Sequence, residues 1–176
     1  VIGQELVREA VLAVLIAWAG ILIYISLRFE YRFGIAGVLA LVQTVLITLG
    51  VVSLLSLEIN TPFVAAILTV VGYTINDTIV IFDRIRENLR VRSREPLVEV
   101  TNVSIRQSLS RSINTGLTTL FVLVALYVFG GTTIKDFTLT LIVGIVIGAL
   151  SSIFVASPLW YVLRHATEGR KGSRAA

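Results

Sequence analysis

Residues 62–82 read PFVAAILTVVGYTINDTIVIF, a long apolar run that carries a single formal charge, on Asp77. About 20 such residues in an α-helix cross the roughly 30 Å hydrocarbon core of a bilayer. A transmembrane β-strand would need about 10 residues of alternating polarity, whereas this run is longer and does not alternate. Because a helix satisfies all of its own backbone hydrogen bonds in lipid, the run predicts a transmembrane helix.

Four further apolar runs flank this one along the chain. Hydrophobic residues make up 56% of the sequence and charged residues 15%, whereas a soluble domain has about 25% charged residues. We therefore predict an all-α membrane protein with five transmembrane helices in one membrane domain, residues 1–165, followed by a basic, disordered tail, residues 166–176. The predicted helices are residues 7–27, 34–57, 62–82, 112–129 and 137–163.

The polar segments between these runs suggest how the helices are connected. Asn60 or Thr61 can cap the third helix, and Pro62 suits the first helical position. A long polar loop is expected over residues 83–111. Within it, Pro96 can start a short helix that ends near residue 109. This segment is either an amphipathic helix at the membrane surface or a solvated linker.

The basic residues predict the orientation in the membrane. All but Arg8 and Lys135 of the 15 Lys and Arg residues fall in the first loop, the long loop or the tail. Cytoplasmic loops carry an excess of basic residues, so these three segments are expected in the cytoplasm and the N-terminus outside. The net charge of +4 then reflects topology and contacts with anionic lipids, and requires no nucleic-acid partner.

Asp77 is the unusual residue of the third helix. It lies about 15 residues into the predicted span, roughly 22 Å from the outer end and below the headgroups. Because a carboxylate there costs on the order of 3 kcal/mol, we expect it to face other helices and either to take a partner or to be protonated. Helical spacing places Tyr73 and Arg84 near the same face, and Asn76 precedes it. The alternative is a shorter span with Asp77 at the membrane surface.

Arg111, at the cytoplasmic start of the fourth helix, is the basic residue best placed to pair with Asp77. It can instead extend toward the headgroups, and the sequence leaves these two arrangements equal. Asn114 and the threonines that follow make the first half of this helix polar.

The remaining motifs favour packing over chemistry. Residues 83–88 extend the third helix beyond the membrane with charges at helical spacing, which predicts a salt-bridged helix end. Gly144, Gly148 and Ser152 form a stripe with four-residue spacing that permits close helix packing. Pro158 is expected to kink the last helix. The chain has no cysteine and one histidine, and shows no nucleophile–base set, so we expect neither a metal site nor an enzyme.

Several motifs resemble those of the SecF family of Sec translocon accessory subunits. Residues 71–88, VGYTINDTIVIFDRIREN, resemble the family signature, and residues 108–115, SLSRSINT, its next motif. The glycines at 130–131 and the residues Lys-Asp-Phe at 135–137 also match. The opening, residues 1–6, resembles the point where the family's chain re-enters the membrane. The absence of methionine also suggests a fragment, which would lack the first helix and the periplasmic domain.

This resemblance implies a fold and a function. The fold would be half of an RND-type transporter membrane domain in the bacterial or archaeal cytoplasmic membrane. The chain would pair with SecD and act with SecYEG, and indirectly with SecA, to drive preprotein export by the proton-motive force. It would need no cofactor beyond the coupling protons. Asp77 and Arg111 would form the proton relay. The supporting residues would be Tyr73, Asn76, Thr78 and Asn114, and the cytoplasmic motif Asp83, Arg84, Arg86, Glu87 and Asn88.

Two other functions remain open from the sequence. One is a proton-driven exporter of small molecules or lipids from the same RND-like superfamily, which would have its own large periplasmic domains and about twelve helices. The other is a structural membrane scaffold, in which Asp77 and Arg111 would together tolerate apolar replacement. Sodium in place of protons is also compatible with the sequence.

Overall fold

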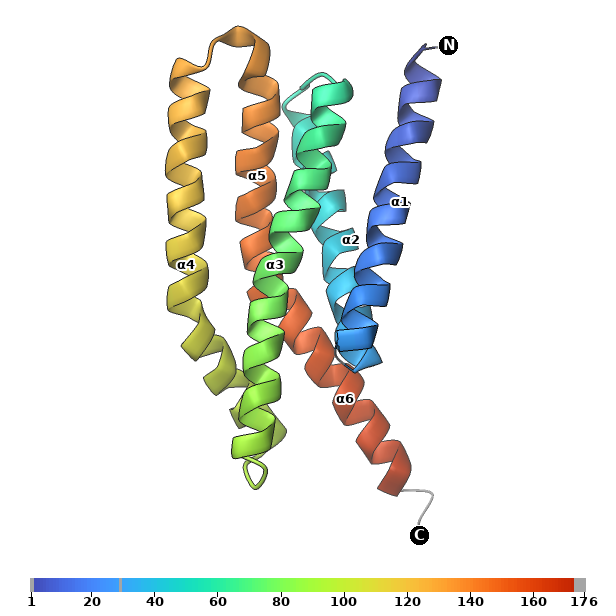
Figure 1. Ribbon diagram of the computed structural model, residues 1–176, viewed down its shortest axis with the longest axis vertical. Coiled ribbons are helices and arrows are strands. Elements are labelled where there is room, and N and C mark those ends of the chain that lie inside the picture. The colour runs from blue at the N-terminus through green and yellow to red at the C-terminus, as the bar shows by residue number, and fades with distance from the viewer. Residues whose placement is uncertain (1, 29, 173–176) are drawn as a thin grey trace.

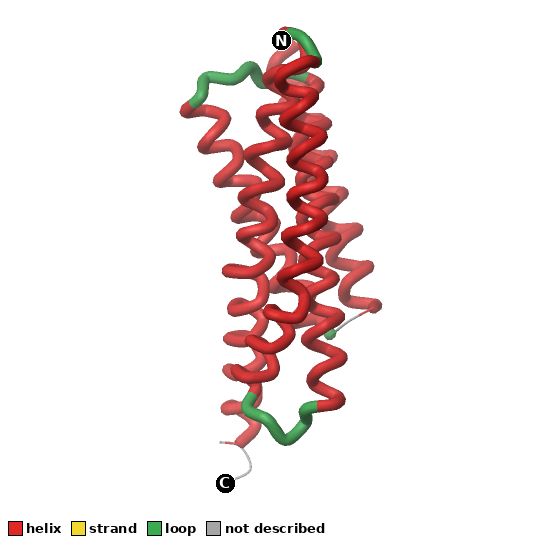
Figure 2. The backbone as a smooth tube through the Cα atoms, turned by 90° about the vertical axis from the view of Figure 1, so that its left-hand side faces the viewer, coloured by secondary structure: helices red, strands yellow, loops and turns green. Residues whose placement is uncertain are grey.

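The structure, a computed structural model, describes residues 2–28 and 30–172, and this part of the chain forms a bundle of helices (Figure 1). The helices run along one long axis, and the longer loops gather at its two ends (Figure 2). The elements are α1 (Ile2–Arg28), α2 (Tyr31–Leu54), α3 (Thr61–Val91), α4 (Leu97–Phe129), the 3-10 helix η1 (Thr132–Ile134), α5 (Lys135–Ser151), the π-helix η2 (Ser152–Ala156) and α6 (Ser157–Gly172).

The described part of the chain contains four helices long and apolar enough to cross a membrane and one shorter apolar helix. The long ones are α2, α3, α4 and the continuous run Thr132–Ala166, and the shorter one is Val11–Ile25 within α1. The five expected apolar helices are therefore confirmed, although α1 has the shortest apolar part. The start of α1 and the end of α6 lie at opposite ends of the bundle, as an odd number of crossings requires (Figure 1).

The connection expected over residues 83–111 is much shorter than predicted, and the expected extension of the third helix through residue 88 is confirmed. Helix α3 continues to Val91 and α4 already begins at Leu97, so only residues 92–96 connect them. Residues 83–91 contain no Gly or Pro, and Arg, Glu and Leu favour helix, so the helix has no reason to stop at the membrane surface. Pro96 starts the next helix as its N-cap, and its carbonyl accepts from Glu99 N at 2.9 Å. The segment after Pro96 is thus the first part of α4, neither a separate surface helix nor a linker.

The expected disordered tail is also wrong for residues 166–172. These residues continue α6, which ends at Gly172. Extending an existing helix adds one hydrogen bond per residue without a new nucleus, and Ala, Glu, Arg and Lys favour it. Residues 173–176 lie outside the described part.

The kink expected at Pro158 is confirmed. The π-helical turn η2 ends directly before Ser157 and Pro158. Proline has no N–H and its ring disturbs the preceding turn, and π-turns are among the identifiable causes of sharp kinks. Ser157 Oγ donates to the carbonyl of Ser152 at 3.2 Å within this turn. Figure 1 shows α6 leaning away from the direction of α5.

Helix α3 occupies the centre of the bundle and contacts α1, α2, α4 and α5. Its start follows the expected chemistry, because Asn60 is the N-cap, its Oδ1 accepts from Phe63 N at 3.0 Å, and Pro62 lies in the first turn. Near its other end, the Phe82 ring packs against Phe33, with ring centroids 4.9 Å apart, and Phe33 stacks on the fully buried Trp160. This aromatic cluster ties α2, α3 and α6 together.

Candidate functional site

Asp77 lies on the side of α3 that faces α4, and its side chain is half-buried. Its Oδ1 accepts a hydrogen bond from Ser112 Oγ of α4 at 2.5 Å. Its Oδ2 is buried and has no hydrogen-bond partner within the described residues. Hydroxyl-to-carboxylate bonds of this length are among the stronger ones in proteins. One carboxylate oxygen is thus bound by the neighbouring helix, while the other has no partner among the described residues.

The close approach of α4 to Asp77 follows from small residues on α4. Ser104, Ser108, Ser112 and Gly116 recur at every fourth position, and all four are buried. Residues four apart lie on one face of a helix, and small side chains there let two backbones approach closely. The same spacing was recognised in the last helix but not here, so sequence reasoning missed Ser112 as the partner of Asp77.

Arg111 does not contact Asp77 in the structure. Its side chain is exposed, and within the described residues it forms no hydrogen bond and no ion pair of 4.0 Å or less. Successive residues on a helix are turned by about 100°, so when Ser112 faces α3, Arg111 points elsewhere. In this conformation Ser112 contacts Asp77, whereas a direct Asp77–Arg111 pair was one of the two expectations.

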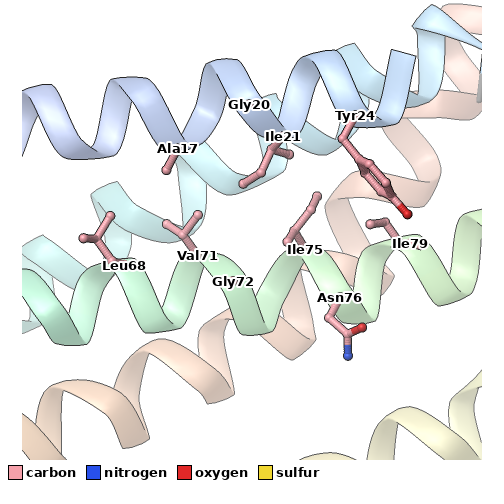
Figure 3. Close-up of a pocket in the computed structure, with 10 residues that line it drawn as sticks. All are labelled: Ala17, Gly20, Ile21, Tyr24, Leu68, Val71, Gly72, Ile75, Asn76 and Ile79. Carbon is pink, nitrogen blue, oxygen red and sulfur yellow. The ribbon is translucent and has the colours of Figure 1, made fainter. Parts of the chain in front are cut away.

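The four supporting polar residues lie in different surroundings. Tyr73 is half-buried one turn before Asp77, whereas Asn114 is exposed on α4. Asn76 is exposed and lines a groove between α3 and α1 (Figure 3). Thr78 is buried, and its hydroxyl lies 2.8 Å from Ser152 Oγ of the last helix. Thr78 therefore belongs to the packing of α3 against η2.

The stripe on the last helix packs against α3. A Cβ added at Gly144 would meet the Val70 side chain, and one added at Gly148 would meet Thr74. Ser152 continues the stripe with hydroxyl contacts to Thr78 and to the Thr74 carbonyl. The glycine backbone of the last helix thus lies directly against side chains of α3.

The cytoplasmic motif forms a polar junction between α3 and α4. The buried amide of Asn88 donates to Ser104 Oγ and to Gln107 Oε1, each at 2.8 Å, and Arg84 Nε donates to the same Gln107 oxygen at 2.7 Å. Arg84 also pairs with Glu87 at 2.5 Å, so an ion pair with helical spacing lies at this helix end, as expected. Asp83 is exposed, and Arg86 lines a small pocket with residues of α2 and α6. Gln107 and Ser104 were not foreseen, because nothing in the sequence fixes the register of α4 against α3.

A Gln107→Leu variant of the full-length protein is expected to lower the free energy of unfolding by about 1–2 kcal/mol. The variant removes the side-chain oxygen that accepts hydrogen bonds from both Asn88 and Arg84. The matched control is Gln43→Leu, since Gln43 Oε1 is buried with no partner in the described part of the chain. The control should be neutral or stabilising. Equal losses in the two variants, measured by denaturation in mixed micelles, would contradict the role given to Gln107.

Comparisons with known proteins identify the family of this chain. Residues 1–166 match the family model described as "Protein export membrane protein SecD/SecF, C-terminal". The chain belongs to this family. Within the described residues no three His, Cys, Asp or Glu side chains come together as metal ligands.

Three relatives show how far the similarity reaches. The chain is 49% identical to protein translocase subunit SecF of Alicyclobacillus acidocaldarius, over 99% of the chain and 58% of that protein. It is 46% identical to protein translocase subunit SecDF of Thermus thermophilus, over 99% of the chain and 24% of that protein. A crystal structure of SecDF in a super-membrane-facing form matches 97% of the chain with a TM-score of 0.91 and 45% identity, over 23% of that chain. The chain therefore spans little more than half of a SecF relative, and it is a multi-pass membrane protein with the fold of the SecDF membrane domain.

Proposed function

We propose that the chain is the membrane part of an export subunit that couples the proton-motive force to protein translocation. Family membership and the translocase names of the relatives support this assignment. The observation that carries it is the Asp77 carboxylate in α3, bound through one oxygen by Ser112 while the other has no partner in the described chain. Intramembrane carboxylates are rare, costly and associated with proton pathways. In this proposal the role of the chain is transport, and the chain catalyses no covalent reaction.

In the proposed cycle, a proton from the outer side binds Asp77 and later leaves to the cytoplasm. Protonation removes the carboxylate charge, which weakens its hydrogen bond with Ser112 and its attraction to Arg111. Because Asp77 and Ser112 join α3 to α4, this change would alter how the two helices pack. Each proton that crosses 100 mV releases about 2.3 kcal/mol. This free energy is enough to favour one packing arrangement of α3 and α4 over another.

The proposed location is the cytoplasmic membrane of a bacterium, with the α1–α2 and α3–α4 connections and the end of α6 in the cytoplasm. These three segments lie at one end of the bundle (Figure 1), and they hold most of the basic residues, as cytoplasmic loops do. The proposed partner in the membrane is SecD, which the name SecDF of the Thermus relative supports. SecYEG, SecA and the moving preprotein complete the proposed assembly.

The test measures preprotein export by membrane vesicles that carry SecYEG, SecA and the full-length protein with SecD. Export is expected to fall when an ionophore collapses the proton gradient, and vesicles without the full-length protein should show no such dependence. In a separate set of vesicles, a sodium gradient replaces the proton gradient. Gradient-driven export of a small molecule or lipid, with preprotein export unaffected, would favour the RND-type exporter instead.

A further inference from the structure

The last transmembrane run changes its hydrogen-bond register at one turn, η2, between α5 and α6. A π-helical turn bonds each residue to the one five positions on instead of four, and such turns are rare and frequently lie at functional sites. The carbonyl of Ser152 here accepts from the hydroxyl of Ser157, five residues later, at 3.2 Å. Pro158 follows and has no N–H. Proline removes the backbone bond that either register would form at its position, which narrows the advantage of the α-helical register over the π-helical one.

The π-turn also corrects the direction in which the helix faces. Buried residues recur at every fourth position along it, at Gly144, Gly148, Ser152, Ala156 and Trp160. In an α-helix four residues turn by about 400°, so a stripe with this spacing drifts by about 40° at each step. The wider π-turn holds more residues per turn and reverses part of this drift. Ser152 therefore faces α3, while Trp160, eight residues later, still stacks on Phe33 of α2.

Buried hydroxyl groups join η2 to α3. Ser152 Oγ lies 2.8 Å from Thr78 Oγ1, and it also contacts the carbonyl of Thr74 at 3.4 Å. Leaving a buried hydroxyl without its partner costs free energy, so the two helices are expected to move together at this level. Thr78 directly follows Asp77 in α3. The hydroxyl pair thus connects η2 to the turn of α3 that carries the carboxylate.

Helix α6 is the part of the chain that a change in η2 would move. It leans away from the direction of α5 and runs toward the end of the bundle where α3 and α4 are connected (Figure 1). On its way it contacts α2 and α4. It has 16 residues, which corresponds to a length of about 24 Å. A small change of angle at η2 would therefore displace the far end of α6 by a larger distance.

We propose that η2 is a joint through which the Thr78–Ser152 pair carries movement of α3 at Asp77 to α6, and so to the cytoplasmic end of the bundle. When α3 shifts, Thr78 moves Ser152, and η2 adjusts because its two registers are close in free energy. Helix α6 then changes its angle to α5. The trigger, a change of charge at Asp77, rests on the proposed function, whereas the joint is a property of η2 and the hydroxyl groups around it.

The test uses the full-length protein in complex with SecD, in nanodiscs and in a cysteine-free background. Spin labels at Val146→Cys on α5 and Val162→Cys on α6, both exposed positions, report the distance between these helices. Asp77→Asn supplies a neutral side chain, and wild type is measured at alkaline pH to keep its carboxyl ionised. We expect the label separation in the two proteins to differ by on the order of 2 Å. A reference pair, Val146→Cys with the exposed Leu46→Cys on α2, should show no difference.

The variant Thr78→Val examines the route, because valine keeps the shape of threonine and lacks the hydroxyl. In this background the change of label separation caused by Asp77→Asn is expected to disappear. The matched control is Thr48→Val, since Thr48 is also fully buried and its hydroxyl donates to the Thr44 carbonyl of its own helix. In the control the change should persist. An undiminished change in Thr78→Val, or an equal loss in both variants, would overturn the proposal.

A second variant, Ser152→Ala, removes the same contact from the side of η2. It should abolish the change as Thr78→Val does, and the combination of the two should have no further effect, because both act on one contact. The joint and the proposed function can fail separately. Equal label separations in wild type and Asp77→Asn would overturn the joint. Export that keeps its ionophore sensitivity in Asp77→Asn would instead overturn the proton site.

Discussion

An Asp77→Asn variant of the intact export complex is expected to lose the part of translocation that depends on the proton gradient, while it folds and inserts normally. Asparagine has nearly the same shape as aspartate, and its side-chain oxygen can still accept the hydrogen bond from Ser112. Its amide cannot bind and release a proton. About 2.3 kcal/mol per proton at 100 mV is then no longer available to the complex.

The measurement compares export with and without an ionophore in wild type and variant. In wild type the ionophore should slow export severalfold, whereas in Asp77→Asn the two rates should coincide at the lower value. The matched control is Asp136→Asn, which makes the same chemical change in the first turn of α5. That turn lies at the end of the bundle where α1 begins (Figure 1). The control should keep its ionophore sensitivity. Wild-type sensitivity in Asp77→Asn would show that the carboxylate is not the proton site.

Ser112 refines this test because it was not expected from the sequence. Ser112→Ala removes the donor to Asp77 Oδ1 but leaves the carboxylate in place. Hydrogen bonds to charged groups contribute about 1.5–3 kcal/mol, so the balance between the protonated and ionised forms should change. We expect Ser112→Ala to shift the pH dependence of gradient-driven export and Asp77→Asn to abolish that export.

The sequence was sufficient for the helices because their signals are local. Apolar length located five helices, and side-chain chemistry located the start of α3 at Asn60 and the kink before Pro158. The end points of the helices were less predictable. The length of an apolar run indicates where the helix leaves the lipid, but not where the helix itself ends. The charge spacing predicted the helical extension over residues 83–88, but not its continuation to Val91 or the junction of Arg84 and Asn88 with Gln107.

The candidate site shows a second limit of sequence reasoning. Depth in the membrane identified Asp77, and charge suggested Arg111 as its partner. The choice between Arg111 and Ser112 depends on the rotation of α4 about its own axis. That rotation is set by the buried small residues at Ser104, Ser108, Ser112 and Gly116. Their four-residue spacing is visible in the sequence, so the face of α4 that contacts α3 could have been inferred. Which residue on that face lies beside Asp77 could not have been inferred.

Gly144→Leu is expected to produce the largest loss of stability of any single substitution considered, about 3 kcal/mol or more. Even a Cβ at this position would overlap both methyl groups of Val70, which is fully buried on α3. Val70 is β-branched and has little rotamer freedom in a helix, so it cannot move aside. The last helix would have to move away from α3, which would also pull Ser152 from Thr78.

The same change at Gly50 of α2 provides the control, because a Cβ there would meet no atom within 4 Å. Both variants introduce one leucine for one glycine in a membrane helix, so they differ only in what the new side chain meets. Denaturation in mixed micelles should therefore show a large loss for Gly144→Leu and little or none for Gly50→Leu. A double variant isolates the cause: Gly144→Ala should be destabilising alone and less so with Val70→Ala, which removes the methyl groups in its way. Additive losses in this pair would mean that the stability of the bundle does not depend on the contact between Gly144 and Val70.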